Sequence, residues 1–92
     1  MNTLNIKKKI EFDTLTVVLI GSEVVEPDNV LAFNKDGKLL WKINDILKIK
    51  NPTGMIDIVK QTNAILSVVS DLSIQYDIEL SSLKIVDKFY LR

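Results

Sequence analysis

The chain of 92 residues contains neither cysteine nor histidine, and these two absences exclude several kinds of site. A disulfide needs cysteine, and a structural zinc site needs cysteine or histidine ligands. Histidine is also the usual proton shuttle near neutral pH, so no serine–histidine or cysteine–histidine nucleophile can form. We therefore expect a single domain, residues 1–92, that depends on its apolar core, binds no cofactor and is not an enzyme.

Glycine and arginine are also scarce. The three glycines lie apart at positions 21, 37 and 54, so the chain has no glycine-rich phosphate loop. The single arginine is residue 92, and twelve basic residues balance twelve acidic ones. A neutral chain with one guanidinium group has no overall field to attract nucleic acid or an anionic membrane. We expect neither as a partner.

Long apolar runs are absent as well, and no stretch approaches the length of a membrane span. The positive charge at Lys7–Lys9 followed by the apolar run 15–20 resembles a signal peptide. Glu11 and Asp13 interrupt that resemblance, and no small-residue cleavage site follows. We expect a cytoplasmic protein. A composition rich in lysine, isoleucine and asparagine is typical of a bacterial one.

What the sequence has instead is period-two alternation of apolar and polar residues, the pattern of half-buried β-strands. In residues 74–80 it places Asp77 and Glu79 on a solvated face. Residues 44–50 fit either a short extra strand or a helical turn. The eight predicted strands cover residues 4–12, 15–20, 29–34, 38–43, 55–60, 64–69, 73–80 and 83–91.

These strands fall into two groups of four that are alike in order and composition. Each group has a strand that is apolar on both faces, 15–20 and 64–69, which needs cover on both sides. The sequence therefore predicts an all-β domain of about eight antiparallel strands, as two four-stranded meanders packed as a small sandwich or barrel.

The hairpin of residues 29–43 shows the clearest turn. Gly37 supplies the positive φ that a type I turn with a G1 bulge requires. With that turn we expect Phe33 opposite Leu39 and Leu31 opposite Trp41, which leaves a second apolar cluster on the other face. The predicted core residues are Leu31, Phe33, Leu39, Trp41, Ile43, Tyr76, Ile78, Ile85 and Phe89, and the second cluster is Val30, Ala32 and Leu40.

Two segments resemble a known family. Val30–Trp41, which contains Asp-Gly-Lys-Leu-Leu-Trp, resembles the blade hairpin of quinoprotein-type (PQQ-like) β-propellers. Ile74–Ile85 is similar to the same element, but has Leu83 where the family places glycine. The two segments cover about a quarter of the chain, and a propeller needs at least four blades. The resemblance therefore implies β-hairpins, and it carries over no cofactor or catalytic residue.

Short charged segments have local roles in this interpretation. Lys7–Lys9 is typical of an edge strand guarded against pairing with other chains. Asn34 and Asp36 stand two apart as at the start of a calcium loop, but the later ligands are missing and a turn is the predicted role. The loop before residue 29 combines negative charge with exposed valines and a stiffening proline. The residues predicted to bind a partner are Glu23, Val24, Val25, Glu26 and Asp28.

The function that fits these observations is a small non-catalytic protein-interaction module, of the immunity or inhibitor type. The alternative is a small β-barrel that binds an apolar small molecule near Trp41 and Tyr76. The second apolar cluster predicts a homodimer, formed by edge pairing or by docking of a sheet face. A monomer in which residues 44–50 cover that face is the competing interpretation.

Overall fold

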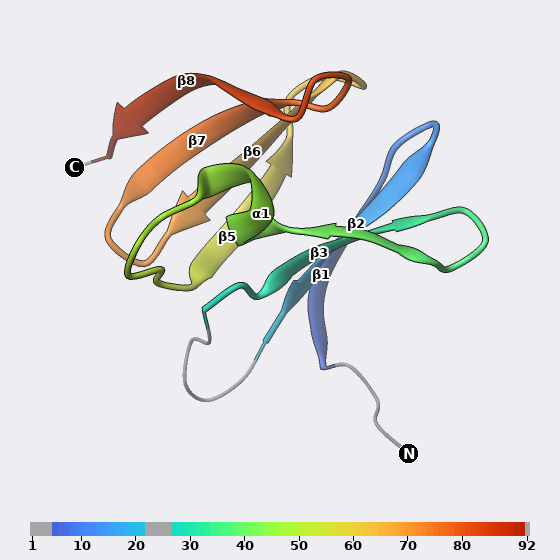
Figure 1. Cartoon of the computed structure of the whole chain (residues 1–92), viewed down its shortest axis with the longest axis horizontal. Helices are drawn as coiled ribbons and strands as arrows, with labels where there is room; N and C mark the ends of the chain where they lie inside the picture. Colours follow the sequence, from blue (N-terminus) through green and yellow to red (C-terminus); the bar gives the residue numbers. More distant parts are fainter. Residues whose placement is uncertain (1–4, 22–26, 92) are drawn as a thin grey trace.

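The computed structural model describes residues 5–21 and 27–91, which form two four-stranded antiparallel sheets and one short helix (Figure 1). Both sheets are meanders, in the orders β1-β2-β3-β4 and β5-β6-β7-β8, and they pack against each other as predicted. The first sheet contains β1 (Ile6–Glu11), β2 (Leu15–Ile20), β3 (Val30–Asn34) and β4 (Leu39–Lys42). The second contains β5 (Met55–Lys60), β6 (Ile65–Ser70), β7 (Ile74–Glu79) and β8 (Lys84–Tyr90).

The connection between the sheets contains α1 (Ile43–Leu47), which settles the two alternatives for this segment in favour of a helical turn. Within the described ranges no strand of one sheet pairs with a strand of the other, so the fold is a sandwich and not a closed barrel. The core fills the space between the sheets. It consists of Phe12, Leu15, Val17, Leu19, Val30, Ala32, Trp41, Ile43, Met55, Ile58, Leu66, Val68, Tyr76 and Ile78.

The turn between β3 and β4 has the predicted geometry. Gly37 has φ of 89° and donates its N–H to the carbonyl of Asn34 at 3.0 Å, while Asn34 donates to the carbonyl of Lys38 at 2.9 Å. The side chain of Asn34 accepts hydrogen bonds from the N–H groups of Asp36 and Lys38, both at 2.9 Å. The side-chain oxygen of Asn34, which would be a ligand in a calcium loop, therefore accepts hydrogen bonds within the turn instead.

The register of this hairpin differs from the prediction beyond the first pair. Phe33 lies opposite Leu39 as expected, but a bulge follows, so Trp41 pairs with Ala32 and not with Leu31. Because one extra residue moves later side chains to the other face, the expected faces are exchanged. Leu31 and Phe33 are half-buried on the outer face, and Leu39 is 42% exposed. Of the expected second cluster, Val30 and Ala32 are core residues, and Leu40 is 46% exposed.

The edges of the two sheets differ in how they are covered. β1, which carries the predicted guarding lysines, is an edge strand and lies beside β5. Lys8 and Asp57 form an ion pair at 3.0 Å across this seam, and the Lys60 ammonium donates to the backbone carbonyl of Glu11 at 3.0 Å. On the opposite side β4 runs directly into α1. The remaining edge is β8.

β8 lies at the outer rim of the second sheet, where its main neighbours are β7 and α1 (Figure 1). Every residue of the strand is exposed. The prediction that Ile85 and Phe89 are buried is therefore wrong: they are 40% and 43% exposed, because the first sheet does not extend over this strand. Trp41, Ile43, Tyr76 and Ile78 are buried as predicted.

Candidate functional site

The short helix α1 is held at both ends by side chains. The Asp28 carboxylate accepts a hydrogen bond from the backbone N–H of Asn44 at 2.7 Å. The Asn44 side chain in turn accepts from the N–H of Ile49 at 3.0 Å and donates to its carbonyl at 3.3 Å. Lys48 ends the helix in the left-handed conformation, with φ of 53°. These contacts fix α1 on the side of the sandwich where β4 and β8 lie apart.

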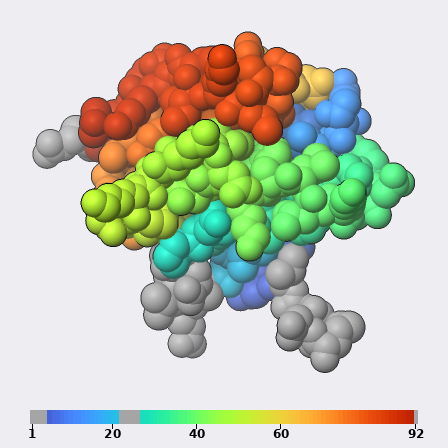
Figure 2. Space-filling view, viewed as in Figure 1, coloured from blue at the N-terminus to red at the C-terminus, as the bar shows by residue number. Residues whose placement is uncertain are grey.

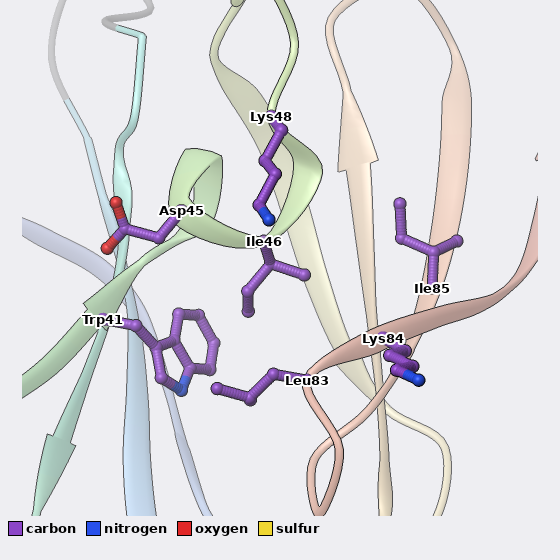
Figure 3. Close-up of a pocket in the computed structure, with 7 residues that line it drawn as sticks. All are labelled: Trp41, Asp45, Ile46, Lys48, Leu83, Lys84 and Ile85. Atoms are coloured by element: carbon purple, nitrogen blue, oxygen red, sulfur yellow. The ribbon is translucent and has the colours of Figure 1, made fainter.

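A cleft of about 390 Å³ opens between α1 and the start of β8. Figure 3 shows its centre, where the Leu83 side chain extends toward the indole ring of Trp41 and Ile46 reaches down from α1. The apolar centre and charged rim are the combination found in many binding sites. The lining residues are Trp41, Asp45, Ile46, Lys48, Leu83, Lys84 and Ile85.

Leu83 holds an unusual backbone conformation in this cleft. It is the last residue of the turn between β7 and β8 and has φ of 55°, and its N–H donates to the carbonyl of Glu79 at 2.8 Å. A residue with a Cβ adopts this left-handed region at a cost, so glycine or asparagine is usual there. The turn that imposes this cost on Leu83 also places its large apolar side chain opposite Trp41. Backbone strain of this kind clusters at functional sites.

The charges of the cleft lie on its rim. Lys48 and Lys84 line one part of it, and Asp45 lies on the other side of α1 (Figure 3). The Asp45 carboxylate accepts a hydrogen bond from the backbone N–H of Lys42 at 3.0 Å, so it serves the start of the helix. The rim is therefore positive on balance, and it favours an apolar group flanked by acidic ones.

The free edge of β8 continues from the cleft. Leu91 donates its N–H to the carbonyl of Ser73 at 2.7 Å, and hydrogen-bonded residues alternate along an antiparallel pair. Phe89 therefore points its backbone groups at β7, and Lys88 and Tyr90 point theirs away from the sheet. The Lys88 N–H donates to the carboxylate of the preceding residue, Asp87, at 2.9 Å, and not to another strand. In Figure 2 this strand forms the upper surface of the molecule, in red. The cleft and the edge together form one surface, which we call the β8 surface (residues 83–91 with Trp41 and Ile46).

Comparison with known proteins identifies a family. Residues 3–90 match a family model described as "Domain of unknown function (DUF7957)". The chain belongs to this DUF7957 family. No curated protein and no solved structure matches the chain. The function must therefore be inferred from the surface of the domain itself.

The residues that the sequence predicted as site residues lie in different parts of the structure. Glu23, Val24, Val25 and Glu26 lie outside the described residues, and Asp28 is half-buried against the start of α1. Trp41 lines the cleft as the alternative function requires. Tyr76 does not line it, because its ring lies in the core with the Lys88 ammonium 5.6 Å above it. Leu83 was missed as a site residue, although its place at a position that favours glycine was a signal.

A second hollow, of about 430 Å³, lies on the outer face of the first sheet over Val18 and Phe33. Glu11 stands at its rim and accepts hydrogen bonds from Thr16 at 2.6 Å and Lys35 at 2.9 Å. These two bonds lower the pKa of the Glu11 carboxyl to about 2. The charged groups of this hollow pair with one another, so it offers a ligand less than the β8 surface does.

A polar cluster on the outer face of the second sheet was not expected. Asp77, predicted on a solvated face, is half-buried and accepts hydrogen bonds from the Ser67 hydroxyl at 2.6 Å and the Gln75 amide at 2.9 Å. Ser67 is fully buried, so its hydroxyl cannot meet a substrate in this conformation. The cluster satisfies a buried hydroxyl and does not form a nucleophilic site.

Metal sites and membrane-spanning helices have no candidate among the residues that the structure describes. Across residues 5–21 and 27–91, no three acidic, histidine or cysteine side chains are grouped so that they could hold a metal ion. No helix in the same ranges is long and apolar enough to cross a membrane.

Proposed function

We propose that this domain is a non-catalytic protein-binding module. Its partner adds an extended segment along β8 and places an apolar side chain in the cleft beside Trp41. The observation that carries the proposal is the open edge of β8, where Lys88 and Tyr90 direct backbone groups away from the sheet. An edge whose backbone groups bond to no other strand is the template for strand addition by a second chain, and an added strand would replace the local bond from the Lys88 N–H to the Asp87 carboxylate.

The other edges support this choice by contrast. β1 carries three consecutive lysines and faces β5 across an ion-paired seam. β4 has four residues and continues into α1. β8 has seven residues, all exposed, and Val86 and Tyr90 within it are 53% and 69% exposed. Natural edges of this length and apolarity are normally blunted or covered, so we assign this one to a partner.

The chemical groups of the β8 surface indicate what kind of partner segment it would bind. Its backbone is extended, because an added strand bonds to the outward N–H and carbonyl groups of an edge strand in turn. One apolar side chain enters the cleft between Trp41 and Leu83. Acidic side chains flank it, because Lys48 and Lys84 line the rim. A small non-catalytic domain with one such surface suits an inhibitor or immunity role, and we propose this role, in the cytoplasm, for the domain.

The test compares proteins captured from the host by wild type and by two variants at one position. Lys88→Pro removes an outward N–H without removing a bond to β7, and Lys88→Ala keeps that N–H. A partner that pairs with β8 should be retained by wild type and Lys88→Ala and lost from Lys88→Pro. Equal retention by all three proteins would reject β8 as the binding edge.

A second candidate function is binding of an apolar small molecule in the cleft, because Trp41, Ile46 and Leu83 line it. Trp41 is the sole tryptophan, so its fluorescence reports on the cleft directly. Titration with dodecanoate, whose carboxylate suits Lys48 and Lys84, should shift the emission to the blue and saturate. The Leu83→Ser variant is the control, since it should weaken this response. An emission spectrum that does not respond would exclude this class of ligand.

A further inference from the structure

We infer that a second copy of this chain pairs antiparallel with the outer edge of β8, with each Phe89 facing its own copy across the two-fold axis. The inference rests on the proposed function, because it uses the same free edge. It adds the identity of one partner and the register in which the two β8 strands pair. The product is a dimer in which the two second sheets join into one continuous sheet.

Symmetry leaves few registers to consider. In an antiparallel pair related by a two-fold axis, the axis lies midway between one residue of β8 and its copy, so that residue faces itself across the pair. The outward backbone groups of Lys88 and Tyr90 must meet outward groups of the second copy. An axis at Val86 would pair across the bulge between β7 and β8, and an axis at Tyr90 would leave too few residues to pair. Asp87, Lys88 and Phe89 remain.

Charge then separates these three positions. Asp87 lies directly opposite Asp77 of β7, so an axis at Asp87 would align four carboxylates across the joined sheet. An axis at Lys88 would place two ammonium groups opposite each other. Like charges that are directly opposed destabilise a strand pair. The axis at Phe89 avoids both arrangements.

With the axis at Phe89 the facing side chains complement one another. The two Phe89 rings meet on one face, and Asp87 faces Leu91 of the second copy. Lys88 faces Tyr90 of the second copy on the other face. Within one chain the Lys88 ammonium already lies 5.6 Å from the centre of the Tyr76 ring and 5.3 Å from that of Tyr90. A second tyrosine at this ammonium adds a further cation–π contact.

The last residues of β8 and the residue after it expose apolar side chains to solvent, which favours their contact with a second chain. Phe89, Tyr90 and Leu91 are 43%, 69% and 40% exposed in one chain. Together they leave both faces of this edge strand partly apolar and open to solvent, which natural edge strands normally avoid. Pairing of two such strands covers part of each exposed side chain and lets the outward backbone groups bond to another strand.

The chain has no cysteine, so a single introduced thiol reports the register. Directly opposed residues that exchange no hydrogen bonds have Cα atoms about 4.5 Å apart, within reach of a disulfide. The Phe89→Cys variant should therefore form a disulfide-linked dimer under mild oxidation. The Asp87→Cys variant is the matched control on the same face. Its two thiols would lie roughly 14 Å apart in this register, so it should stay reduced.

Sedimentation of the protein without a thiol tests the same inference independently. Wild type and Lys88→Ala should approach twice the chain mass of 10.4 kDa from micromolar to millimolar concentration, and Lys88→Pro should stay at that mass. An unchanged circular dichroism spectrum for Lys88→Pro shows that the sheet is intact. Disulfide formation in Asp87→Cys but not in Phe89→Cys would overturn the register. A wild type that stays monomeric would overturn the dimer, while the proposed function would stand if Lys88→Pro still lost a captured protein.

Discussion

The side-chain amide of Asn29 exchanges two hydrogen bonds with the backbone of Met55, donating to its carbonyl at 2.8 Å and accepting from its N–H at 2.7 Å. Asn29 comes just before β3 and Met55 begins β5, so one amide joins the two sheets in the way that a strand residue joins its neighbour. Both residues are buried, at 5% and 2% exposed. The geometry of the sandwich at this end depends on that contact.

The Asn29→Ala variant should lose about 2–4 kcal/mol of unfolding free energy, because it leaves two buried backbone groups of Met55 without partners. Urea denaturation followed by circular dichroism measures the change. Asn51→Ala, at an exposed asparagine, is the control and should stay within about 0.5 kcal/mol of wild type. Equal stability of the two variants would show that the Asn29 contact contributes nothing.

The Trp41→Ala variant should cost about 3–5 kcal/mol, because the indole ring is a buried core side chain and its removal leaves a cavity. That loss is a large part of the stability of so small a domain. The melting temperature by circular dichroism should fall sharply. Leu40→Ala, at the neighbouring exposed leucine, should melt close to wild type. A Trp41→Ala variant that also melts close to wild type would place the ring outside the core.

The Leu83→Gly variant should be more stable than Leu83→Ala by about 1 kcal/mol, because only glycine adopts φ of 55° without a Cβ penalty. Both variants lose the side chain that faces Trp41, so their difference isolates the backbone strain. Chemical denaturation of the pair gives this difference. If Leu83→Ala proved the more stable, the backbone at this turn would carry no strain to explain.

The Glu11 carboxyl should titrate with a midpoint at about 2, below its ordinary value of 4.5, because Thr16 and Lys35 donate hydrogen bonds to its charged form. The folded state then holds fewer protons than the unfolded state as pH falls below about 4.5. Stability from this group is present above that pH and is lost as pH falls through about 2. Carboxyl chemical shifts followed by NMR measure the midpoint. The Lys35→Met variant should raise it, and an unmoved midpoint would exclude a role for Lys35.

The sequence predicted the strands better than it predicted the site. The sequence predicted Trp41 near a ligand, but it did not predict Leu83 as a site residue, because forty-two positions separate Leu83 from the tryptophan that it faces. Alternation along 74–80 describes which residues share a face, and it contains no information about what lies across from that face. The cleft is made by the packing of α1 against the second sheet, which no local pattern encodes.

The sequence by itself determined the eight strands, their order in two meanders and the turn at Gly37. Each of these depends on residues that are neighbours along the chain: period-two alternation makes a strand, and a missing Cβ permits a positive φ. Tertiary structure decided which side of β3 and β4 is buried, because the bulge between the pairs Phe33–Leu39 and Ala32–Trp41 moves Trp41 to the face of Ala32. It also decided that β8 is left open, since the extent of one sheet over the other depends on contacts between residues far apart in the sequence.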